Sequence, residues 1–225
     1  MRHPHHPVVA IGAAASVVAG IFTPAAAADS AVPLGGGAGI TVNGTPCTLT
    51  TIGHDRSGAL VGFSAGHCGG PGADVAAAGA NNGTVGSVTT VGDGLDYAVI
   101  KFDPAKVSPT ASVAGFPVTG IGPDPDWHQH VCMNGAANGT ICGGVASMPG
   151  PGPRGGTSHA LFQPGEDGAP ITTDGRLIGV AFEGLNTPGD LQGLAPSNFT
   201  DFTKFSAIVN DVNAKGGPGA GFTPI

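Results

Sequence analysis

Three residues whose side chains could perform acid–base chemistry are spread through the chain. His67 follows a run of small residues, and Asp96 opens the apolar run Tyr97–Phe102. Asp167 lies farther on, in the turn-rich segment 165–170. An imidazole that a carboxylate orients can serve as a general base toward a third group. Each residue alone has an ordinary structural explanation, so the chemistry depends on a fold that brings the three together.

Short apolar runs between turn residues make up most of the chain, and they predict β-strands. The expected strands of the first half span residues 39–42, 47–52, 59–64, 85–91 and 97–102. Those of the second half span residues 129–133, 140–147, 160–163, 177–182 and 191–195. Many short strands at regular spacing are typical of β-barrels or sandwiches.

Other segments connect or flank these strands. Aromatic and branched residues recur at three- and four-residue spacings from 198 to 213, which predicts one amphipathic helix. The Pro-, Gly- and Ser-rich segment 107–126 is the expected connection between the two strand sets. We expect the glycine run at 35–37 to belong to a mobile N-terminus, and the glycine-rich tail, 214–225, to be flexible.

The N-terminal 28 residues have the pattern of an export signal. A short polar start precedes an apolar stretch over residues 8–22, and small residues end at Ala27 or Ala28. This pattern predicts a signal peptide, residues 1–28, cleaved after one of these two alanines. A membrane anchor is the alternative, but the run is short and interrupted by glycine. We therefore expect a secreted or envelope-exported protein that is not held in the membrane.

Composition limits the classes of function. Acidic residues outnumber basic ones by 15 to 8, which argues against a nucleic-acid surface. The 41 glycines and 20 prolines bring the chain into the range where disorder is considered, but a 40% apolar fraction in short runs favours a turn-rich β protein. The glycine run at 35–37 lacks the lysine and hydroxyl residue of a phosphate loop, and we expect no cofactor.

Four cysteines in an exported chain predict two disulfides. The residues are Cys47, Cys68, Cys132 and Cys142, and they allow three pairings. Pairing between sequence neighbours would place one bridge in each half, each contributing about 3 kcal/mol through loop-closure entropy. A zinc site is the alternative, but the spacings lack the paired C-x₂-C form.

Taken as a set, these motifs resemble the chymotrypsin-like serine proteases, especially the bacterial streptogrisin and α-lytic type. The segment G-E-D-G-A-P at 165–170 looks like the G-D-S-G-G-P loop of that family. The order of His67, Asp96 and this loop is the order of the family's catalytic residues. Residues 131–135 and 139–143, which carry Cys132 and Cys142, look like the disulfide hairpin of the second barrel.

The resemblance covers the chain from Ile40 to about Asn213 and implies an all-β fold. Two antiparallel six-stranded β-barrels would span residues 29–118 and 119–213, with a cleft between them. A C-terminal helix would close the second unit. Our strand, linker and helix assignments agree with this architecture.

The resemblance also implies a role for each candidate residue. His67 would accept a proton from the nucleophile, Asp96 would orient the imidazole, and the amides of Gly165 and Asp167 would form an oxyanion hole. Asp167, however, stands in the position of the nucleophile serine. A carboxylate that attacked a peptide bond would form a mixed anhydride, far uphill of the amide. We expect Asp167 either to approach His67 and raise its pKa or to turn into the anion site.

Other residues depart from the family pattern around this loop. Glu166 replaces an aspartate that the family buries as an ion-pair partner, and Ala169 replaces a glycine. The segment containing Phe182, Glu183 and Gly184 matches the strand edge that binds the substrate backbone. Phe182 and Glu183 would crowd or charge that edge.

These observations favour a secreted pseudoprotease that binds a peptide or protein in its cleft without cutting it. The alternative is a serine-type hydrolase with residual or non-standard activity that uses His67 and Asp96. Its nucleophile would be Ser64 or Ser158 in place of Asp167, although Ser64 is expected to pack inside. His128 and His130 would share one face of a strand and could bind a metal or sense pH, but we favour two solvated histidines and expect no metal site.

Overall fold

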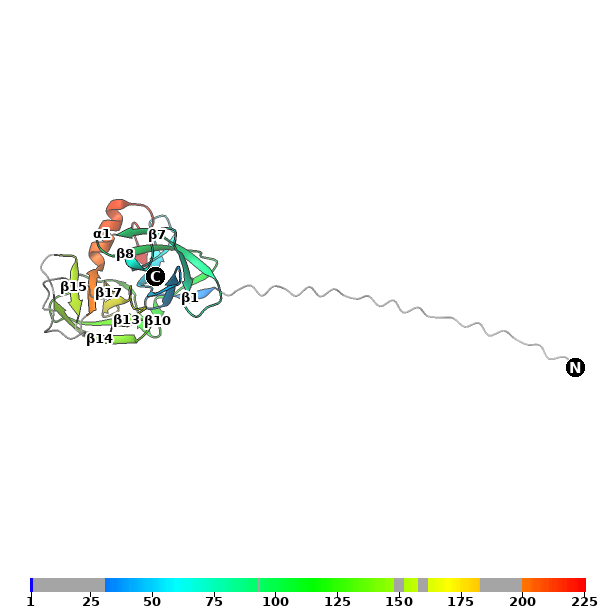
Figure 1. The fold of residues 1–225 in the computed structure, drawn as a ribbon, viewed down its shortest axis with the longest axis horizontal. Helices are drawn as coiled ribbons and strands as arrows, with labels where there is room; N and C mark the ends of the chain where they lie inside the picture. Colours follow the sequence, from blue (N-terminus) through cyan, green and yellow to red (C-terminus); the bar gives the residue numbers. More distant parts are fainter. Residues whose placement is uncertain (2–30, 93, 148–151, 158–161, 183–199) are drawn as a thin grey trace.

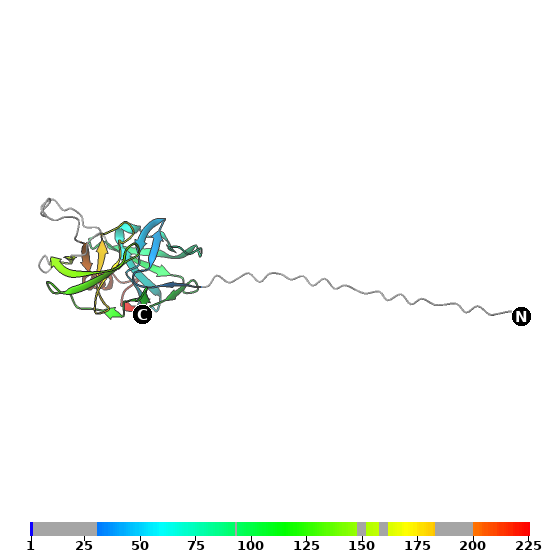
Figure 2. The ribbon, with the colours of Figure 1, turned by 90° about the horizontal axis from the view of Figure 1, so that it is seen from below.

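The computed structural model describes residue 1 and residues 31–92, 94–147, 152–157, 162–182 and 200–225. Two curled sheets lie side by side, the first drawn in blue to green with one C-terminal strand in red, and the second in green to orange (Figures 1 and 2). A C-terminal helix, α1 (Phe205–Lys215), lies against them. The expected all-β fold with two barrel-like units and a terminal helix is confirmed.

The first sheet is antiparallel and has the strand order β19-β4-β5-β8-β7-β6-β2-β3. Its strands are β2 (Gly39–Val42), β3 (Thr45–Thr48), β4 (Thr51–His54), β5 (Leu60–Ala65), β6 (Asp74–Ala77), β7 (Thr84–Gly92), β8 (Tyr97–Phe102) and β19 (Thr223–Pro224). The strand expected at 47–52 is divided into β3 and β4. This division and the unexpected strands β6 and β19 bring the five expected strands to eight.

The second sheet closes on itself through six strands, because β17 also pairs with β18. Its strands are β13 (His130–Gly135), β14 (Gly139–Ser147), β15 (Arg154–Thr157), β16 (Pro170–Thr173), β17 (Arg176–Phe182) and β18 (Thr200–Lys204). The short strand β12 (Gly120–Ile121) joins β17 in parallel. Residues 160–161 and 191–195, where two further strands were expected, lie outside the described residues.

The expected connection at 107–126 contains four short strands. β9 (Val107–Pro109) pairs in parallel with β1 (Val32–Leu34), and β10 (Ser112–Val113) forms a hairpin with β11 (Phe116–Pro117). The chain passes to the second sheet at β12.

Three apolar clusters hold the fold together. One fills the first barrel around Ile40 and Ile100, and one fills the second around Met133 and Phe202. The third lies between the barrels. In it, the Phe63 ring of β5 meets the rings of Phe205 and Phe222 edge-on, with centroids 5.2 and 5.0 Å away.

The expected start of the helix is wrong. Residues 200–204 form β18, and α1 begins only at Phe205. Phe202 and Phe205 fit a helical spacing, but β18 pairs with β15 on one side and β17 on the other. Pairing along both edges outweighs the local periodicity, because it closes the barrel.

The flexible tail is also contradicted. Ala220 and Phe222 are 5% and 7% exposed, and Thr223–Pro224 pair with β4 as β19. The glycine run at 35–37, expected to be mobile, is buried and follows β1. Gly37 has φ +92°, and a Cβ there would fall 1.9 Å from the Asn134 side-chain nitrogen, so the run is a tight packing element.

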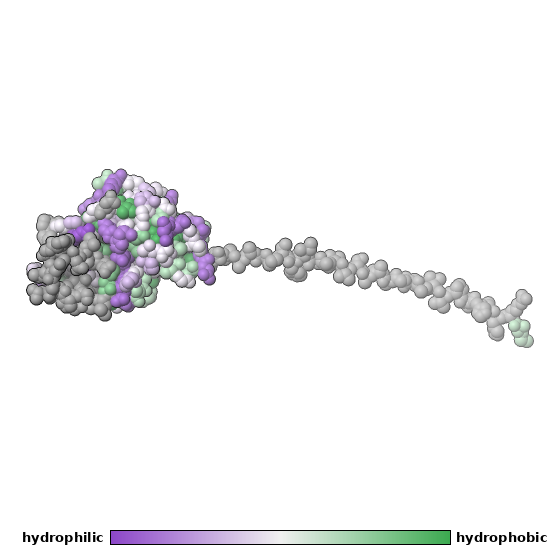
Figure 3. All heavy atoms as spheres, viewed as in Figure 1, coloured by the Kyte–Doolittle hydropathy of each residue, from purple (hydrophilic) through white to green (hydrophobic). Residues whose placement is uncertain are grey.

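Both disulfides between sequence neighbours are present, Cys47–Cys68 and Cys132–Cys142. No helix within the described residues is long and apolar enough to cross a membrane. Hydrophilic residues are spread over the described part of the face in Figure 3, between isolated hydrophobic spots. The large apolar side chains that are exposed among the described residues are Met1, Trp127 and Ile225.

The packing of the tail leads to a first prediction. Replacing Phe222 with alanine removes a ring that contacts Phe63 and Phe205, and it should lower the free energy of unfolding by about 3–5 kcal/mol. Urea denaturation measures the change. Ile225→Ala is the matched control, because Ile225 is 39% exposed at the same end of the chain. Equal stability of the two variants would show that the tail does not pack.

Candidate functional site

Hydrogen bonds between the two barrels dock the turn at 165–169. The Thr48 hydroxyl donates to the Gly165 carbonyl at 2.7 Å, and the Thr50 hydroxyl donates to the Gly168 carbonyl at 2.6 Å. The Thr48 amide donates to the Asp167 carbonyl at 2.8 Å. Both threonines are fully buried in the first barrel. The turn of the second barrel is thereby fixed against the first.

Glycine is required where this turn touches the first barrel. Gly168 has φ +91°, and a Cβ there would lie 2.4 Å from both the Ser64 hydroxyl and the Thr48 carbonyl. Ala169, which replaces a glycine of the family pattern, is fully buried and is not among the residues with positive φ. The turn therefore has glycine at 168, where the backbone requires it, and alanine at 169, where it does not.

His67 lies in the one-turn helix η1 (Gly66–Cys68), directly after β5 and beside the Cys47–Cys68 bridge. Its amide donates to Asp96 Oδ1 at 2.9 Å, and its ring Nδ1 lies 2.8 Å from Asp96 Oδ2. Asp96 occupies the turn before β8 with φ 51°, a left-handed conformation that aspartate tolerates. The predicted proximity of His67 and Asp96 is thus present, with the carboxylate contacting both the backbone and the ring.

The other ring nitrogen of His67 faces Asp167. The distance from His67 Nε2 to Asp167 Oδ1 is 3.1 Å. Of the two alternatives for Asp167, the structure shows the approach to His67. The histidine side chain is 48% exposed, whereas Asp96 and Asp167 are 22% and 16% exposed. An imidazole that solvent can reach is therefore held between two more buried carboxylates.

This arrangement favours the charged form of His67. The hydrogen bond to Asp167 and then that to Asp96 raise the pKa of His67 to about 10, against the smaller opposing effect of burial. Burial acts to raise the pKa of Asp96, but the hydrogen bonds and charge of His67 hold that pKa below its usual value. At neutral pH, a pKa of about 10 leaves roughly one His67 ring in a thousand neutral.

Hydrogen bonds to the Glu166 side chain support the turn at 165–169. The side chain is fully buried, and its two oxygens accept the amides of Asn138 and Gln163 at 3.1 and 2.8 Å. Burial raises the pKa of Glu166, and the charge of Asp167 adds to this effect. Glu166 thus reaches backbone amides, where the resemblance led us to consider an ion pair.

Arg154 of β15 is a residue that the sequence analysis missed. Its guanidinium lies 4.7 Å from the centroid of the Phe182 ring and donates to the Gly94 carbonyl at 3.5 Å. Its charge also helps to lower the pKa of Asp96. No local sequence signal marks Arg154, because its partners come from distant segments.

The structure describes some of the other site residues expected from the sequence, and the rest lie outside the described residues. Phe182 is 3% exposed at the end of β17, and its crowding of the substrate edge stays a prediction. Glu183, Gly184 and Ser158 lie outside the described residues. Ser64 is fully buried, as expected, and donates to the Thr48 carbonyl at 2.8 Å. An oxyanion hole from the amides of Gly165 and Asp167 stays a prediction.

The effect of Asp167 on the pKa of His67 can be measured. Asp167→Asn removes one carboxylate, and we expect the pKa of His67 to fall from about 10 toward its usual value of 6.5. An NMR titration of the His67 ring gives both values. Asp126→Asn, at an exposed acid whose backbone amide donates to Gln129 Oε1, is the control and should leave the titration unchanged. An unchanged His67 pKa in Asp167→Asn would contradict the contact.

The same ion pairs predict a pH-dependent stability. Because folding raises the pKa of His67, the excess stability of the wild type over His67→Gln should be complete between pH about 4 and 6.5. It should decline above pH 6.5 and be gone once the pH exceeds about 10. At lower pH it should also fall, as Asp96 is protonated. Urea denaturation of both proteins across this range tests the profile, and a difference that grows above pH 7 would exclude it.

No protein-family model matches the chain, and no curated protein matches it. Several solved structures do match the chain. The Nocardiopsis protease NAPase has a TM-score of 0.63 and 21% identity over 81% of this chain and 97% of its own. Alpha-lytic protease homolog N4 has a TM-score of 0.62 and 27% identity over 85% and 99%. The Cellulomonas bogoriensis chymotrypsin has a TM-score of 0.61 and 22% identity over 86% and 98%. The structural neighbours are bacterial chymotrypsin-like serine proteases, and the chain has their fold.

Proposed function

We propose that this protein is an exported, non-catalytic relative of the chymotrypsin-like proteases that binds a peptide or protein segment between its barrels. In this proposal, Asp167 occupies the place of the nucleophile serine. The observation that carries the proposal is the 3.1 Å contact between Asp167 Oδ1 and His67 Nε2. That contact uses the nitrogen that would accept the proton of a nucleophile.

Two physical reasons make this contact incompatible with acyl transfer. An ionised Asp167 has no proton for a base to remove, and an acyl-aspartate would be an anhydride at higher energy than the peptide bond. A His67 with a pKa of about 10 is also already protonated at neutral pH, so it cannot act as the base. The general base and the nucleophile are therefore lost together.

Ligand binding is supported by geometry that does not depend on the serine. The His67 side chain remains 48% exposed between two docked barrels, so a bound segment can reach it. The comparison proteins with this fold are proteases, and proteases bind extended peptides. Export is supported by the signal pattern at 1–28 and by two disulfides, which persist in oxidising compartments.

One observation favours a second candidate, a residual serine-type hydrolase. The His67–Asp96 pair keeps both of its hydrogen bonds, the arrangement that orients a catalytic base. A nucleophile would then have to come from elsewhere, and Ser64 is buried with its hydroxyl bonded to Thr48. The two candidates predict opposite results with a reagent for activated serines.

The decisive assay uses a fluorophosphonate probe, which labels activated serines, on the wild type and His67→Ala. We expect no labelling that depends on His67, and no cleavage of a peptide pool by mass spectrometry. The same pool should shift the NMR signals of the His67 ring, because peptides bind beside it and remain intact. Labelling of the wild type that disappears in His67→Ala would establish the hydrolase instead.

Asp167→Ser is the complementary variant. It should gain probe labelling, because it supplies a hydroxyl at the same place and allows the pKa of His67 to fall. Asp167→Ala, which removes the carboxylate without adding a nucleophile, is the matched control and should remain unlabelled. Equal labelling of the two variants would show that Asp167 is not what prevents the chemistry.

A further inference from the structure

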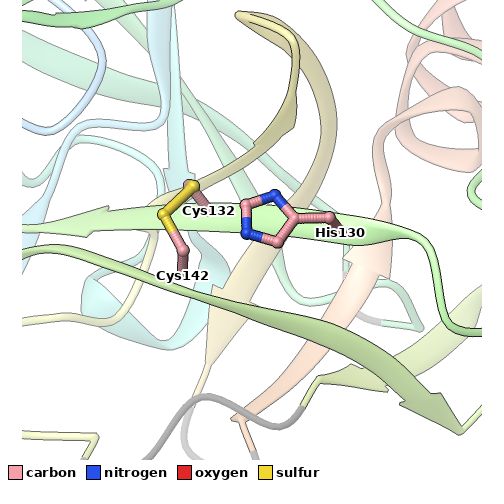
Figure 4. Close-up of side chains that lie close together, drawn as sticks. All are labelled: His130, Cys132 and Cys142. Atoms are coloured by element: carbon pink, nitrogen blue, oxygen red, sulfur yellow. A yellow bond between two sulfur atoms is a disulfide. The ribbon is translucent and has the colours of Figure 1, made fainter.

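A histidine and a disulfide lie together on the outer face of the second barrel. The ligand atoms of His130, Cys132 and Cys142 all lie within 4.8 Å of one another. Figure 4 shows the His130 ring beside the two sulfur atoms, on neighbouring strands. His67 and Asp167 are not members of this cluster.

Strand geometry explains why the three side chains meet. Successive side chains of β13 point to opposite faces, so Val131 and Met133 are fully buried while His130 and Cys132 share the other face. Cys142 of β14 lies directly opposite Cys132 in the antiparallel register. His130 and Cys142 are exposed, so solvent and solutes reach this cluster.

The hairpin does not depend on the disulfide for its register. Six residue pairs join β13 to β14, from His130↔Gly144 to Gly135↔Gly139. β13 is also paired with β16 on its other side. If the bridge is opened, these backbone hydrogen bonds still hold Cys132 and Cys142 opposite each other, with Cα atoms that are 4.0 Å apart in the bridged form.

The two disulfides differ in access. Cys47 and Cys68 are 2% and 4% exposed, whereas Cys142 is exposed and Cys132 is half-buried. A thiol reductant must reach a sulfur atom to attack it, so the Cys132–Cys142 bridge should open first. The reductant gives up two electrons and forms its own disulfide, while the S–S bond of the protein becomes two thiols.

We propose that the β13–β14 hairpin becomes a zinc site when a thiol reductant opens the Cys132–Cys142 disulfide, with His130 as the third ligand. Two thiolates and one imidazole are a known donor set for Zn²⁺, with the fourth position open to water. Zn–S bonds of about 2.3 Å place two sulfurs about 3.8 Å apart in a tetrahedral site. Cross-strand neighbours can meet this separation by rotating their side chains. The two thiol protons leave to solvent when the metal binds.

The test begins with selective reduction. The full chain is treated briefly with a dithiol, the dithiol is removed under argon, and alkylation followed by mass spectrometry identifies the free thiols. They should be Cys132 and Cys142 only. Titration with Cd²⁺ should then give a thiolate charge-transfer absorption that saturates at one ion per chain, and Zn²⁺ should displace it. The oxidised protein should show neither signal.

His130→Ala and His128→Ala form a matched pair. His130→Ala should weaken Zn²⁺ binding by roughly tenfold or more, since even groups that only orient a ligand contribute that much. His128→Ala should bind as the wild type does, because the His128 ring stacks on Trp127, with centroids 5.2 Å apart, and is outside the cluster. The proposal is overturned by equal effects of the two variants, by a reduced chain that binds no metal, or by loss of the near-ultraviolet circular dichroism on reduction.

Discussion

The docking of the 165–169 turn on the first barrel is the constraint on which the site depends. Two buried hydroxyls, those of Thr48 and Thr50, reach carbonyls on either side of Asp167, and the Thr48 amide bonds the Asp167 carbonyl itself. Breaking these bonds would leave buried polar groups unpaired, at a cost of about 1–3 kcal/mol each. The turn is therefore held in one place, and the side chain of Asp167 has His67 as its neighbour.

Charges of alternating sign follow from this docking. Arg154 acts on Asp96, Asp96 holds Nδ1 of His67, and Asp167 holds Nε2. Each group stabilises the charged form of the next. One carboxylate orients the imidazole as it would orient a catalytic base, but a second carboxylate stabilises the imidazolium up to a pH of about 10. A site that could position a base for proton transfer here holds an ion pair between the barrels, which is why we propose binding and not hydrolysis for it.

The sequence predicted the parts of the structure that local pattern determines. Short apolar runs located β2 to β5, β7, β8, β13, β14 and β17, and the neighbouring cysteines formed the bridges that their spacing favoured. It was wrong where distant pairing decides. Residues 200–204 have a helical period but complete a barrel, and the glycine-rich tail packs Phe222 between Phe63 and Phe205. For Asp167 the sequence left two orientations open, because the position of its turn depends on Thr48 and Thr50, more than a hundred residues away.

Neutron diffraction from a deuterated crystal at neutral pD tests whether His67 is a doubly protonated imidazolium, because it shows the hydrogen positions on the ring. We expect deuterium on both ring nitrogens, with Nδ1 directed at Asp96 and Nε2 directed at Asp167. A ring that carries deuterium on Nδ1 alone, with Asp167 turned away from Nε2, would contradict it. That result would mean that His67 remains available as a base.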